Sequence, residues 1–204
     1  MLSIRNITII LLVVSASINV TGLSASAETG KCEATMNDVE GPYYLPGAPF
    51  RNQIAGPDEQ GERVVLKGAV RQTDCKSPIK DALIEVWQTD AGGEYYYQDT
   101  GFRLRGQMKT DRNGYYELST VKPGRYRIMN GFRPAHIHLK ISHPDYKTVI
   151  TQLYFKGDPY LWPNDACGSG CKSNDPRRII ALDDEKGVLT GTFDITLHPS
   201  STSR

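Results

Sequence analysis

Hydrophobic and polar positions alternate along most of the chain after residue 60, with a period of two rather than 3.6. Seven short segments carry this pattern and are rich in β-branched or aromatic residues: 64–72, 82–88, 115–121, 126–130, 135–141, 149–155 and 189–197. Turn-forming clusters such as TDRNG, KPG and SHPD separate them. Because no segment has a convincing amphipathic helical pattern, we expect an all-β sandwich of about seven to eight short strands.

Two stretches lack this alternation. Residues 28–63 include the sequence EGPYYLPGAPF, rich in glycine and proline, which predicts an ordered but irregular N-terminal arm. Residues 175–187, DPRRIIALDDEKG, are predicted to form a long connection with room for one helical turn. The expected architecture is therefore a sandwich with an irregular arm and long loops.

The first 27 residues have the pattern of a secretory signal peptide. Arg5 precedes an apolar run, residues 7–18, and the sequence SASA ends at Ala27. The alternative is a membrane anchor, but the run is shorter than the roughly 20 residues that span a bilayer. We expect cleavage after Ala27 and an exported domain of residues 28–204, periplasmic in a bacterium or extracellular in a eukaryote.

The charge of the chain is balanced. Lys and Arg number 24 and Asp and Glu 23, and loss of Arg5 with the signal peptide would leave 23 of each. Without a basic run, neither a nucleic acid nor, for the mature form, a membrane is an expected partner.

Four cysteines follow the predicted signal peptide, and an even count in an exported chain favours two disulfides. Three connectivities are possible. The sequence CGSGC holds Cys167 and Cys171 in one turn, which favours that pair and leaves Cys32 with Cys75. A zinc site is the alternative, although only one cysteine pair is close in sequence.

His136 and His138 lie two residues apart in the predicted strand 135–141. Residues i and i+2 of a strand point to the same face, so the two imidazoles are near enough to bind one metal ion. The alternative is a pair of surface histidines. The opposite face of this strand is apolar and should belong to the core: Ala135, Ile137, Leu139 and Ile141.

A second metal hypothesis uses other residues. Fe(II) oxygenases bind iron through two histidines and a carboxylate, and His143, Asp145 and His198 offer that set. It is the weaker hypothesis, because Pro144 places the first two in a turn and because His136 and His138 would remain unused.

Tyrosine is abundant, with eleven residues against five phenylalanines. A phenolate is a hard anionic donor that loses its proton far below its usual pKa when it binds a cation. Such a donor suits ferric iron.

Five segments, in this order, resemble the intradiol ring-cleavage dioxygenases, especially those of the protocatechuate 3,4-dioxygenase type: EGPYYLPGAPFR, ALIEVWQTDAGGEYYYQD, TDRNGYYELSTVKPGRYRI, RPAHIHLKIS and ITQLYFKGDPY. They run from about residue 40 to 160. The combination is specific, whereas each segment alone is not. The cysteines and the predicted signal peptide suggest a secreted branch.

The resemblance implies a non-haem Fe(III) centre. Its ligands would be Tyr95, Tyr126, His136 and His138, with a register in which Tyr96 or Tyr97 replaces Tyr95 as the alternative. The implied substrates are a catechol-type compound and O2, and the implied product is a cis,cis-muconate-type diacid.

The resemblance also implies roles around the substrate. Arg133 and Gln152 would be catalytic, as would Tyr126, which leaves the metal to admit the substrate. Tyr43 and Tyr44 would line the pocket. The alternatives are a surface salt bridge for Arg133 and an outward strand position for Gln152.

Part of the strand pattern also resembles transthyretin-like and carboxypeptidase-regulatory modules, which mostly bind or brace. A sandwich alone does not decide function. The complete set of two tyrosines and two histidines favours the enzyme, while the particular catechol and the oligomeric state stay open.

Overall fold

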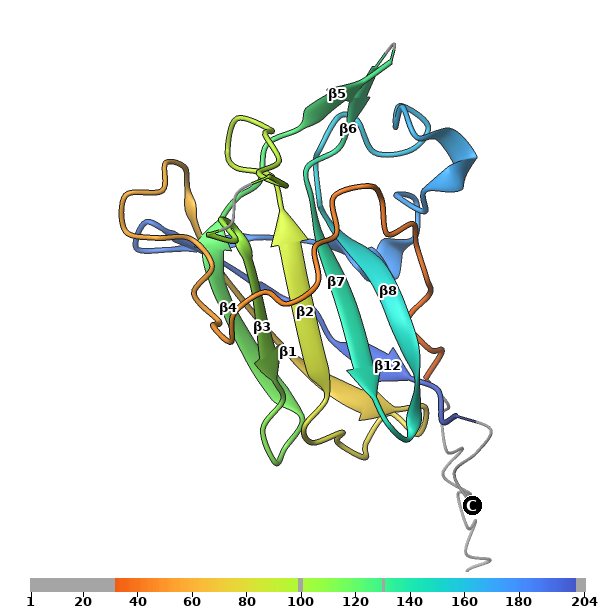
Figure 1. Cartoon of the computed structure of the whole chain (residues 1–204). Helices are drawn as coiled ribbons and strands as arrows, with labels where there is room; N and C mark the ends of the chain where they lie inside the picture. Colours follow the sequence, from red (N-terminus) through yellow and green to blue (C-terminus); the bar gives the residue numbers. More distant parts are fainter. Residues whose placement is uncertain (1–31, 99–100, 130, 201–204) are drawn as a thin grey trace, which may run out of the picture.

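Two β-sheets pack face to face in the computed structural model, which describes residues 32–98, 101–129 and 131–200 (Figure 1). The predicted signal peptide, residues 1–27, lies outside the described residues. The first sheet contains β1 (Arg63–Gln72), β4 (Tyr115–Val121), β10 (Asp183–Glu185), β11 (Val188–Thr192) and β12 (Ile195–Leu197). The second contains β2 (Leu83–Gln88), β3 (Arg105–Lys109), β7 (His136–His143), β8 (Tyr146–Phe155) and β9 (Ile179–Ile180). The predicted all-β sandwich is confirmed.

Strand β1 is the centre of the first sheet. It pairs antiparallel with β4 on one side, and its two halves pair in parallel with β11 and then β12 on the other. The predicted strand 189–197 is thus two strands, interrupted at Phe193 and Asp194. Opposite the interruption lies Gly68, where an added Cβ would be 2.0 Å from the Phe193 carbonyl oxygen. Only glycine fits that position of β1.

The second sheet has the order β3-β2-β7-β8-β9. Strands β3, β2, β7 and β8 run antiparallel to their neighbours, and the short β9 is parallel to β8. The register puts three side chains in one row across the sheet: Trp87, His138 and Gln152. This row is the base of the candidate site described below.

Apolar side chains from the inner faces of both sheets form the core. Period-two alternation explains which residues contribute. On β7, Ile137, Leu139 and Ile141 are at most 1% exposed and belong to this cluster, as the sequence pattern predicts. The first sheet contributes residues of the same kind: Val64, Leu66, Val70, Leu118, Ile195 and Leu197.

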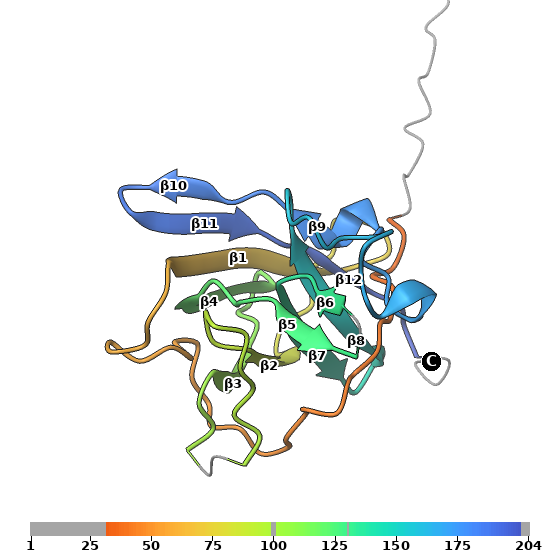
Figure 2. The same ribbon diagram turned by 90° about the horizontal axis from the view of Figure 1, so that it is seen from above.

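The outer face of the second sheet is covered by the predicted N-terminal arm, coloured orange in Figure 1. The Asp38 amide donates to the Ile150 carbonyl (2.8 Å), and Phe50 forms an isolated bridge with Gln107 of β3. The arm therefore crosses from β8 to β3, and Figure 2 shows it lying outside the sheet. The outward-pointing side chains near the start of β7, such as His138 and Gln152, are consequently buried, whereas Lys109 and Thr148 on the same face are exposed.

The connections differ in part from the sequence expectation. The predicted strand 126–130 is shorter and forms a hairpin, β5 (Tyr126–Ile128) with β6 (Gly131–Arg133). The helical turn expected in residues 175–187 is a 3-10 turn, η2 (Pro176–Arg178), and the same stretch also contains β9 and β10. Another 3-10 turn, η1 (Gly168–Gly170), lies in the long loop after β8.

Two disulfides join the four cysteines in the pairing that the sequence favours, Cys32–Cys75 and Cys167–Cys171. The bonded sulfurs argue against the alternative of a zinc site built from these thiols. Among the described residues there is no helix of the length and apolarity that crossing a membrane requires.

Candidate active site

The four side chains expected to bind metal converge at one end of the second sheet. Tyr95 follows β2, Tyr126 begins β5, and His136 and His138 begin β7. The Tyr95 hydroxyl is 3.5 Å from His136 Nε2. Neighbouring ring centroids are close: 5.4 Å between the two tyrosines, 5.6 Å between Tyr126 and His136, and 4.9 Å between the two histidines. The structure brings all four rings together.

The three consecutive tyrosines have different surroundings. Tyr95 is 8% exposed and faces the histidines. Tyr96 points elsewhere: its hydroxyl donates to the Asp90 carboxylate (2.7 Å), and Arg103 lies over its ring. Tyr97 is 49% exposed. The geometry therefore favours the register that begins with Tyr95.

Both histidines are held as neutral imidazoles. Each is only 2% exposed, so the alternative of two surface histidines is wrong. Burial lowers the pKa of His136 to about 3 and the pKa of His138 well below its usual range. His136 Nδ1 donates to the Pro134 carbonyl (2.7 Å), which leaves the Nε2 lone pair directed at Tyr95. A neutral imidazole with one nitrogen so anchored has the form that binds metal.

Trp87 orients the second histidine. Its ring stacks on His138 with centroids 4.7 Å apart and planes 8° from parallel. Among the described residues, no hydrogen-bond partner meets His138 Nδ1 or Trp87 Nε1. Packing rather than hydrogen bonding therefore fixes this ring.

Burial makes the phenols of Tyr95 and Tyr126 harder to deprotonate in the absence of a metal. It raises the pKa of Tyr95 well above its usual value, and the neighbouring Tyr126 adds to that rise. Burial also raises the pKa of Tyr126, while Arg133 opposes the shift. Only a nearby cation would stabilise both phenolates in this setting. Two neutral imidazoles, the buried phenol of Tyr95 and the partly buried phenol of Tyr126 thus form a donor set that fits a ferric ion.

Arg133 lies beside these rings, as expected, and its side chain is buried. The side chain is 4% exposed, and its Nε donates to Asp165 Oδ1 (2.9 Å), whose side chain is fully buried. Its terminal nitrogens lie 3.4 Å from the Tyr126 hydroxyl and 2.7 Å from Gln152 Oε1. The surface salt-bridge alternative for Arg133 is wrong, because this ion pair is enclosed.

Gln152 is on the outer face of its sheet, in line with His138, but it is enclosed and is therefore not an ordinary outward strand glutamine. The residue is fully buried, donates through Nε2 to the Val39 carbonyl (2.8 Å) and accepts from Arg133. The Tyr154 hydroxyl lies 2.8 Å from Gln152 Oε1 and 3.0 Å from Asp38 Oδ2. Gln152 therefore orients Arg133 and ties it to the arm.

Three residues of this network were not predicted from the sequence: Asp38, Tyr154 and Asp165. Tyr154 lies two residues after Gln152, so strand periodicity places both on one face and offered a signal. Asp38 and Asp165 lie in irregular segments, where no periodic pattern points to the site. Asp38 forms a buried ion pair with Arg178 (2.6 Å).

Arg105 is a further buried cation near the site. It is aligned with Trp87 in the β2–β3 register and is 1% exposed. Its three guanidinium nitrogens have no hydrogen-bond partner among the residues that the structure describes. Burial lowers its pKa, and Tyr95 opposes the shift. No role was predicted for it.

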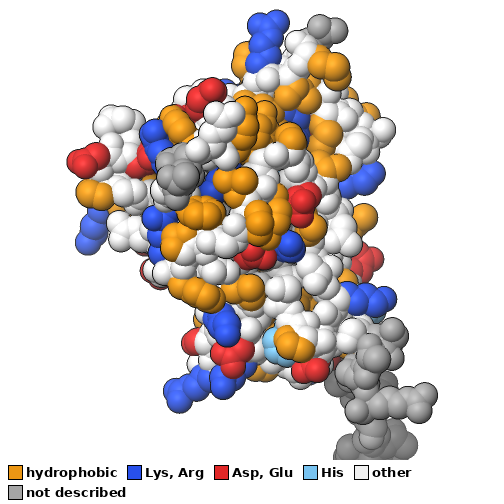
Figure 3. Space-filling model, in the orientation of Figure 1, with side chains coloured by type: hydrophobic (Ala, Val, Ile, Leu, Met, Phe, Trp, Pro, Cys, Tyr) orange, Lys and Arg blue, Asp and Glu red, His pale blue; other side chains and the backbone are white. Residues whose placement is uncertain are grey.

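Tyr43 and Tyr44, the expected pocket residues, lie differently. The Tyr43 ring stacks on Tyr95 at 4.1 Å and meets Tyr126 edge-on at 6.3 Å. Tyr44 instead donates to Glu85 (2.8 Å) and packs against Trp87. Tyr43 thus borders the four rings, whereas Tyr44 lies one row further along the sheet. Figure 3 shows this face of the molecule, where apolar side chains gather over the arm and adjoining loops.

The second metal hypothesis, which uses His143, Asp145 and His198, is not supported by a comparable cluster of side chains among the described residues. His143 Nδ1 is 3.8 Å from Asp145 Oδ2. Within the described ranges, however, no three His, Cys, Asp or Glu side chains form a group that could hold a metal ion, so His198 does not join this pair.

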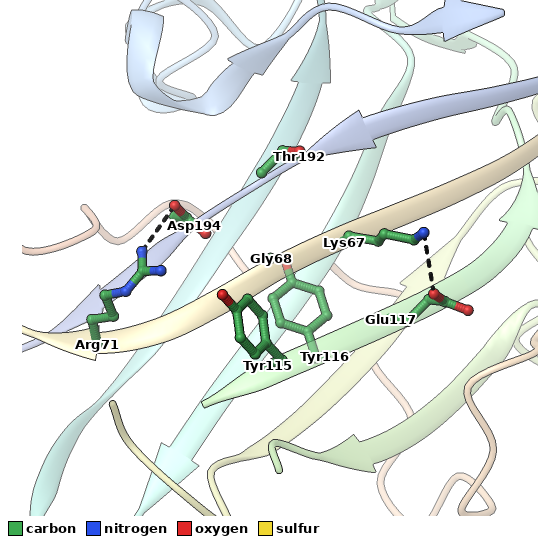
Figure 4. Close-up of a pocket in the computed structure, with 8 residues that line it drawn as sticks. All are labelled: Lys67, Gly68, Arg71, Tyr115, Tyr116, Glu117, Thr192 and Asp194. Carbon is green, nitrogen blue, oxygen red and sulfur yellow. Dashed lines mark hydrogen bonds and ion pairs between the residues drawn. The ribbon is translucent and has the colours of Figure 1, made fainter. Parts of the chain in front are cut away.

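A separate cavity of about 610 Å³ lies on the outer face of the first sheet (Figure 4). Its charged groups pair with one another, Lys67 with Glu117 (3.7 Å) and Arg71 with Asp194 (3.0 Å). The Tyr116 hydroxyl donates to the Phe193 carbonyl (2.7 Å). With these polar groups already paired, the cavity offers no reactive constellation.

Comparison with known proteins agrees with the site. A family model described as Dioxygenase matches residues 39–199. Catechol 1,2-dioxygenase 2 of Acinetobacter lwoffii is 35% identical over 68% of this chain and 57% of its own length. The chain belongs to the intradiol dioxygenase family, rather than to the regulatory modules that share its strand pattern.

Solved structures support the same family. The dioxygenase domain of a dioxygenase–carbohydrate-binding fusion from Streptomyces sp. SirexAA-E has a TM-score of 0.71 and 32% identity, covering 82% of this chain and all of that domain. The 3-chlorocatechol 1,2-dioxygenase of Rhodococcus opacus 1CP has a TM-score of 0.73 and 27% identity, covering 83% of this chain and 74% of the other. The chain spans 47–65% of the length of four curated relatives that it matches.

Proposed function

We propose that the protein is a non-haem Fe(III)-dependent intradiol dioxygenase. It would insert both atoms of O2 into a catechol-type ring, cleave it between the two hydroxylated carbons and release a cis,cis-muconate-type diacid. The observation that carries this proposal is the convergence of four rings, three of them buried and that of Tyr126 partly buried, with the Tyr95 hydroxyl 3.5 Å from His136 Nε2.

Tyr95, Tyr126, His136 and His138 would hold the iron. When bound, ferric iron would act as a Lewis acid and template that makes the catecholate reactive toward O2 without a reducing cosubstrate. The two phenolates would balance much of its charge. The two imidazoles already present neutral nitrogens, because burial lowers the pKa of each.

The protein's own groups would handle protons and charge. Tyr126 is only partly buried and lies 3.4 Å from Arg133. Its oxygen would hold the iron in the resting enzyme and would take a proton from the substrate hydroxyl. Arg133 would stabilise the negative charge that develops on the substrate. Gln152 would hold Arg133 in place, and Tyr43 would pack against the substrate ring.

The names of the relatives support a catechol as the class of substrate, since they include catechol and chlorocatechol 1,2-dioxygenases. We further propose that the protein is exported, because two disulfides persist best in an oxidising compartment.

Metal analysis and colour test this proposal. Holoprotein made with iron supplied should contain about one iron per chain and be red-brown, because phenolate-to-ferric charge transfer absorbs visible light. A colourless protein that holds about one zinc and no iron would contradict the assignment.

A further inference from the structure

The Cys167–Cys171 disulfide closes a small loop beside the polar network that surrounds Arg133. Asp165 lies just before this loop, and Lys172 follows it directly. Each end of the loop is bonded to a different part of the network.

The first end contacts Arg133 and its strand. Asp165 Oδ1 accepts both from Arg133 Nε (2.9 Å) and from the Cys167 amide (2.9 Å). The Ala166 amide donates to the carbonyl of Phe132, the residue before Arg133 in β6 (3.1 Å). The first end of the loop thus forms hydrogen bonds with the side chain of Arg133 and with the backbone of the residue before it.

The second end contacts the arm. The Lys172 amide donates to Asp38 Oδ2 (3.2 Å), which also lies 3.0 Å from the Tyr154 hydroxyl. That hydroxyl is 2.8 Å from Gln152 Oε1, which accepts from Arg133 (2.7 Å). A chain of polar contacts therefore runs from Lys172 through Asp38, Tyr154 and Gln152 to the guanidinium of Arg133.

We propose that the Cys167–Cys171 disulfide is a positioning element of the active site. By fixing the spacing between the loop's ends, it holds Asp165 and Asp38, and through them it orients Arg133. This inference rests on the proposed function, because it is that reaction which gives Arg133 a substrate. Loop entropy makes this short bridge the less stabilising of the two disulfides, so orientation is its main contribution.

Replacing one disulfide at a time tests the proposal in the iron-loaded full chain. C167A/C171A should retain iron and its visible absorption but lose about tenfold or more in kcat, with a smaller change in KM, because a small misplacement of a charge-stabilising group is costly. The comparison variant C32A/C75A removes the other bridge, which joins the start of the arm to the turn after β1. It should lower stability and should reduce turnover less than C167A/C171A does, because both ends of the loop at residues 165–172 keep their bridge.

Asp165→Asn provides a second variant that keeps the disulfide and a similar side-chain shape. It removes the charge that pairs with Arg133, so it should lower kcat in the same way as C167A/C171A. If C167A/C171A does not fold, the turnover and the hydrogen exchange of Asp165→Asn decide the question.

Hydrogen exchange of residues 131–133 gives a readout independent of turnover. Exchange there should rise in C167A/C171A and in Asp165→Asn, while exchange in β1 and β4 stays as in the wild type. Wild-type kcat in a folded C167A/C171A would overturn the proposal, as would unchanged exchange at 131–133. If that variant does not fold, wild-type kcat and unchanged exchange in Asp165→Asn would overturn it. A wild-type protein that binds iron but cleaves no catechol would instead refute the proposed function, and the exchange result would still judge the positioning role.

Discussion

Tyr95 and Tyr126 differ in burial, and this difference predicts separate mutant behaviour. Tyr95 is almost fully buried beneath Tyr43, whereas Tyr126 is half-buried and contacts Arg133. Tyr126→Phe should keep iron but lose most turnover, because Tyr126 is the ligand proposed to give way to the substrate. Tyr95→Phe should weaken iron retention and visible absorption, because Tyr95 is the ligand proposed to stay. Iron content, spectra and turnover of both variants are the measurements.

The variant Tyr96→Phe is a suitable control, since that hydroxyl donates to Asp90 and not to the site. It should leave iron content and turnover as in the wild type. Full iron and full activity in both Tyr95→Phe and Tyr126→Phe would show that neither is a ligand.

Arg133 should be important for stability as well as turnover. Its ion pair with Asp165 is enclosed, and removing one partner of such a pair costs roughly 3–5 kcal/mol because a charge is left buried. Arg133→Ala should therefore lower the free energy of unfolding by that amount and reduce turnover about 10²–10³-fold, as lost charge stabilisation does. Denaturant unfolding and steady-state kinetics measure the two effects.

Arg71→Ala is the control for the stability effect. The side chains of its ion pair with Asp194 are 30% and 53% exposed, and such solvent-accessible pairs contribute about 1 kcal/mol or less. Equal losses of stability in Arg71→Ala and Arg133→Ala would contradict the buried ion pair.

At the residue scale, strand periodicity and the family resemblance were sufficient to predict the positions of the candidate metal ligands. Periodicity placed His136 and His138 on one face, and the structure shows that face covered by the arm. It could not identify Asp38 or Asp165, because each comes from an irregular segment that only the complete fold brings to Arg133. The burial of Arg133 was equally hidden, since an isolated arginine in a sequence gives no sign of its partners.

At the element scale, a close backbone contact brings the two tyrosines together. Gly93 has φ +92°, and a Cβ there would lie 2.2 Å from the Arg125 carbonyl oxygen. The Gly124 amide also donates to the Asp90 carbonyl (2.7 Å). The loop after β2 is thus held against the start of β5, which places Tyr95 beside Tyr126.

Gly93→Ala should separate these two elements and lower iron retention. Gly187→Ala is a matched control, because Gly187 has a similar φ of +88° but nothing within 4 Å of an added Cβ. The control should cost only the left-handed backbone penalty, roughly 1–2 kcal/mol, and should retain iron. Thermal unfolding and iron content distinguish the variants, and equal iron content would contradict the role of this contact.

Strand β3 shows why element prediction from sequence was incomplete. Its sequence, RGQMK, has no β-branched or aromatic residue, so propensity did not reveal it. Its Gly106 lies where a Cβ would be 2.6 Å from the Arg51 carbonyl oxygen of the arm. Tertiary packing therefore selects this strand, whereas β7 and β8 carry a clear alternation and were predicted near their observed limits.

At the scale of the whole molecule, the Cys32–Cys75 bridge fastens the start of the described arm to the turn after β1. It closes a loop with a sequence separation of 43 residues. Loop-entropy arguments give such a bridge about 3–4 kcal/mol of stabilisation. C32A/C75A should accordingly unfold at a lower denaturant concentration, as followed by tryptophan fluorescence. An unchanged midpoint would show that the arm is held without the bridge.

The whole molecule places its reactive groups between a sheet and the arm that covers it, and the outcome of the reaction tests that arrangement most directly. The measurement is mass spectrometry of the product formed from catechol under 18O2. Intradiol cleavage by a ferric centre at Tyr95, Tyr126, His136 and His138 predicts a colourless muconate that carries both atoms of O2, one of them diluted if water exchanges. A yellow semialdehyde from cleavage beside the diol would contradict the account. So would turnover that survives His136→Ala and His138→Ala.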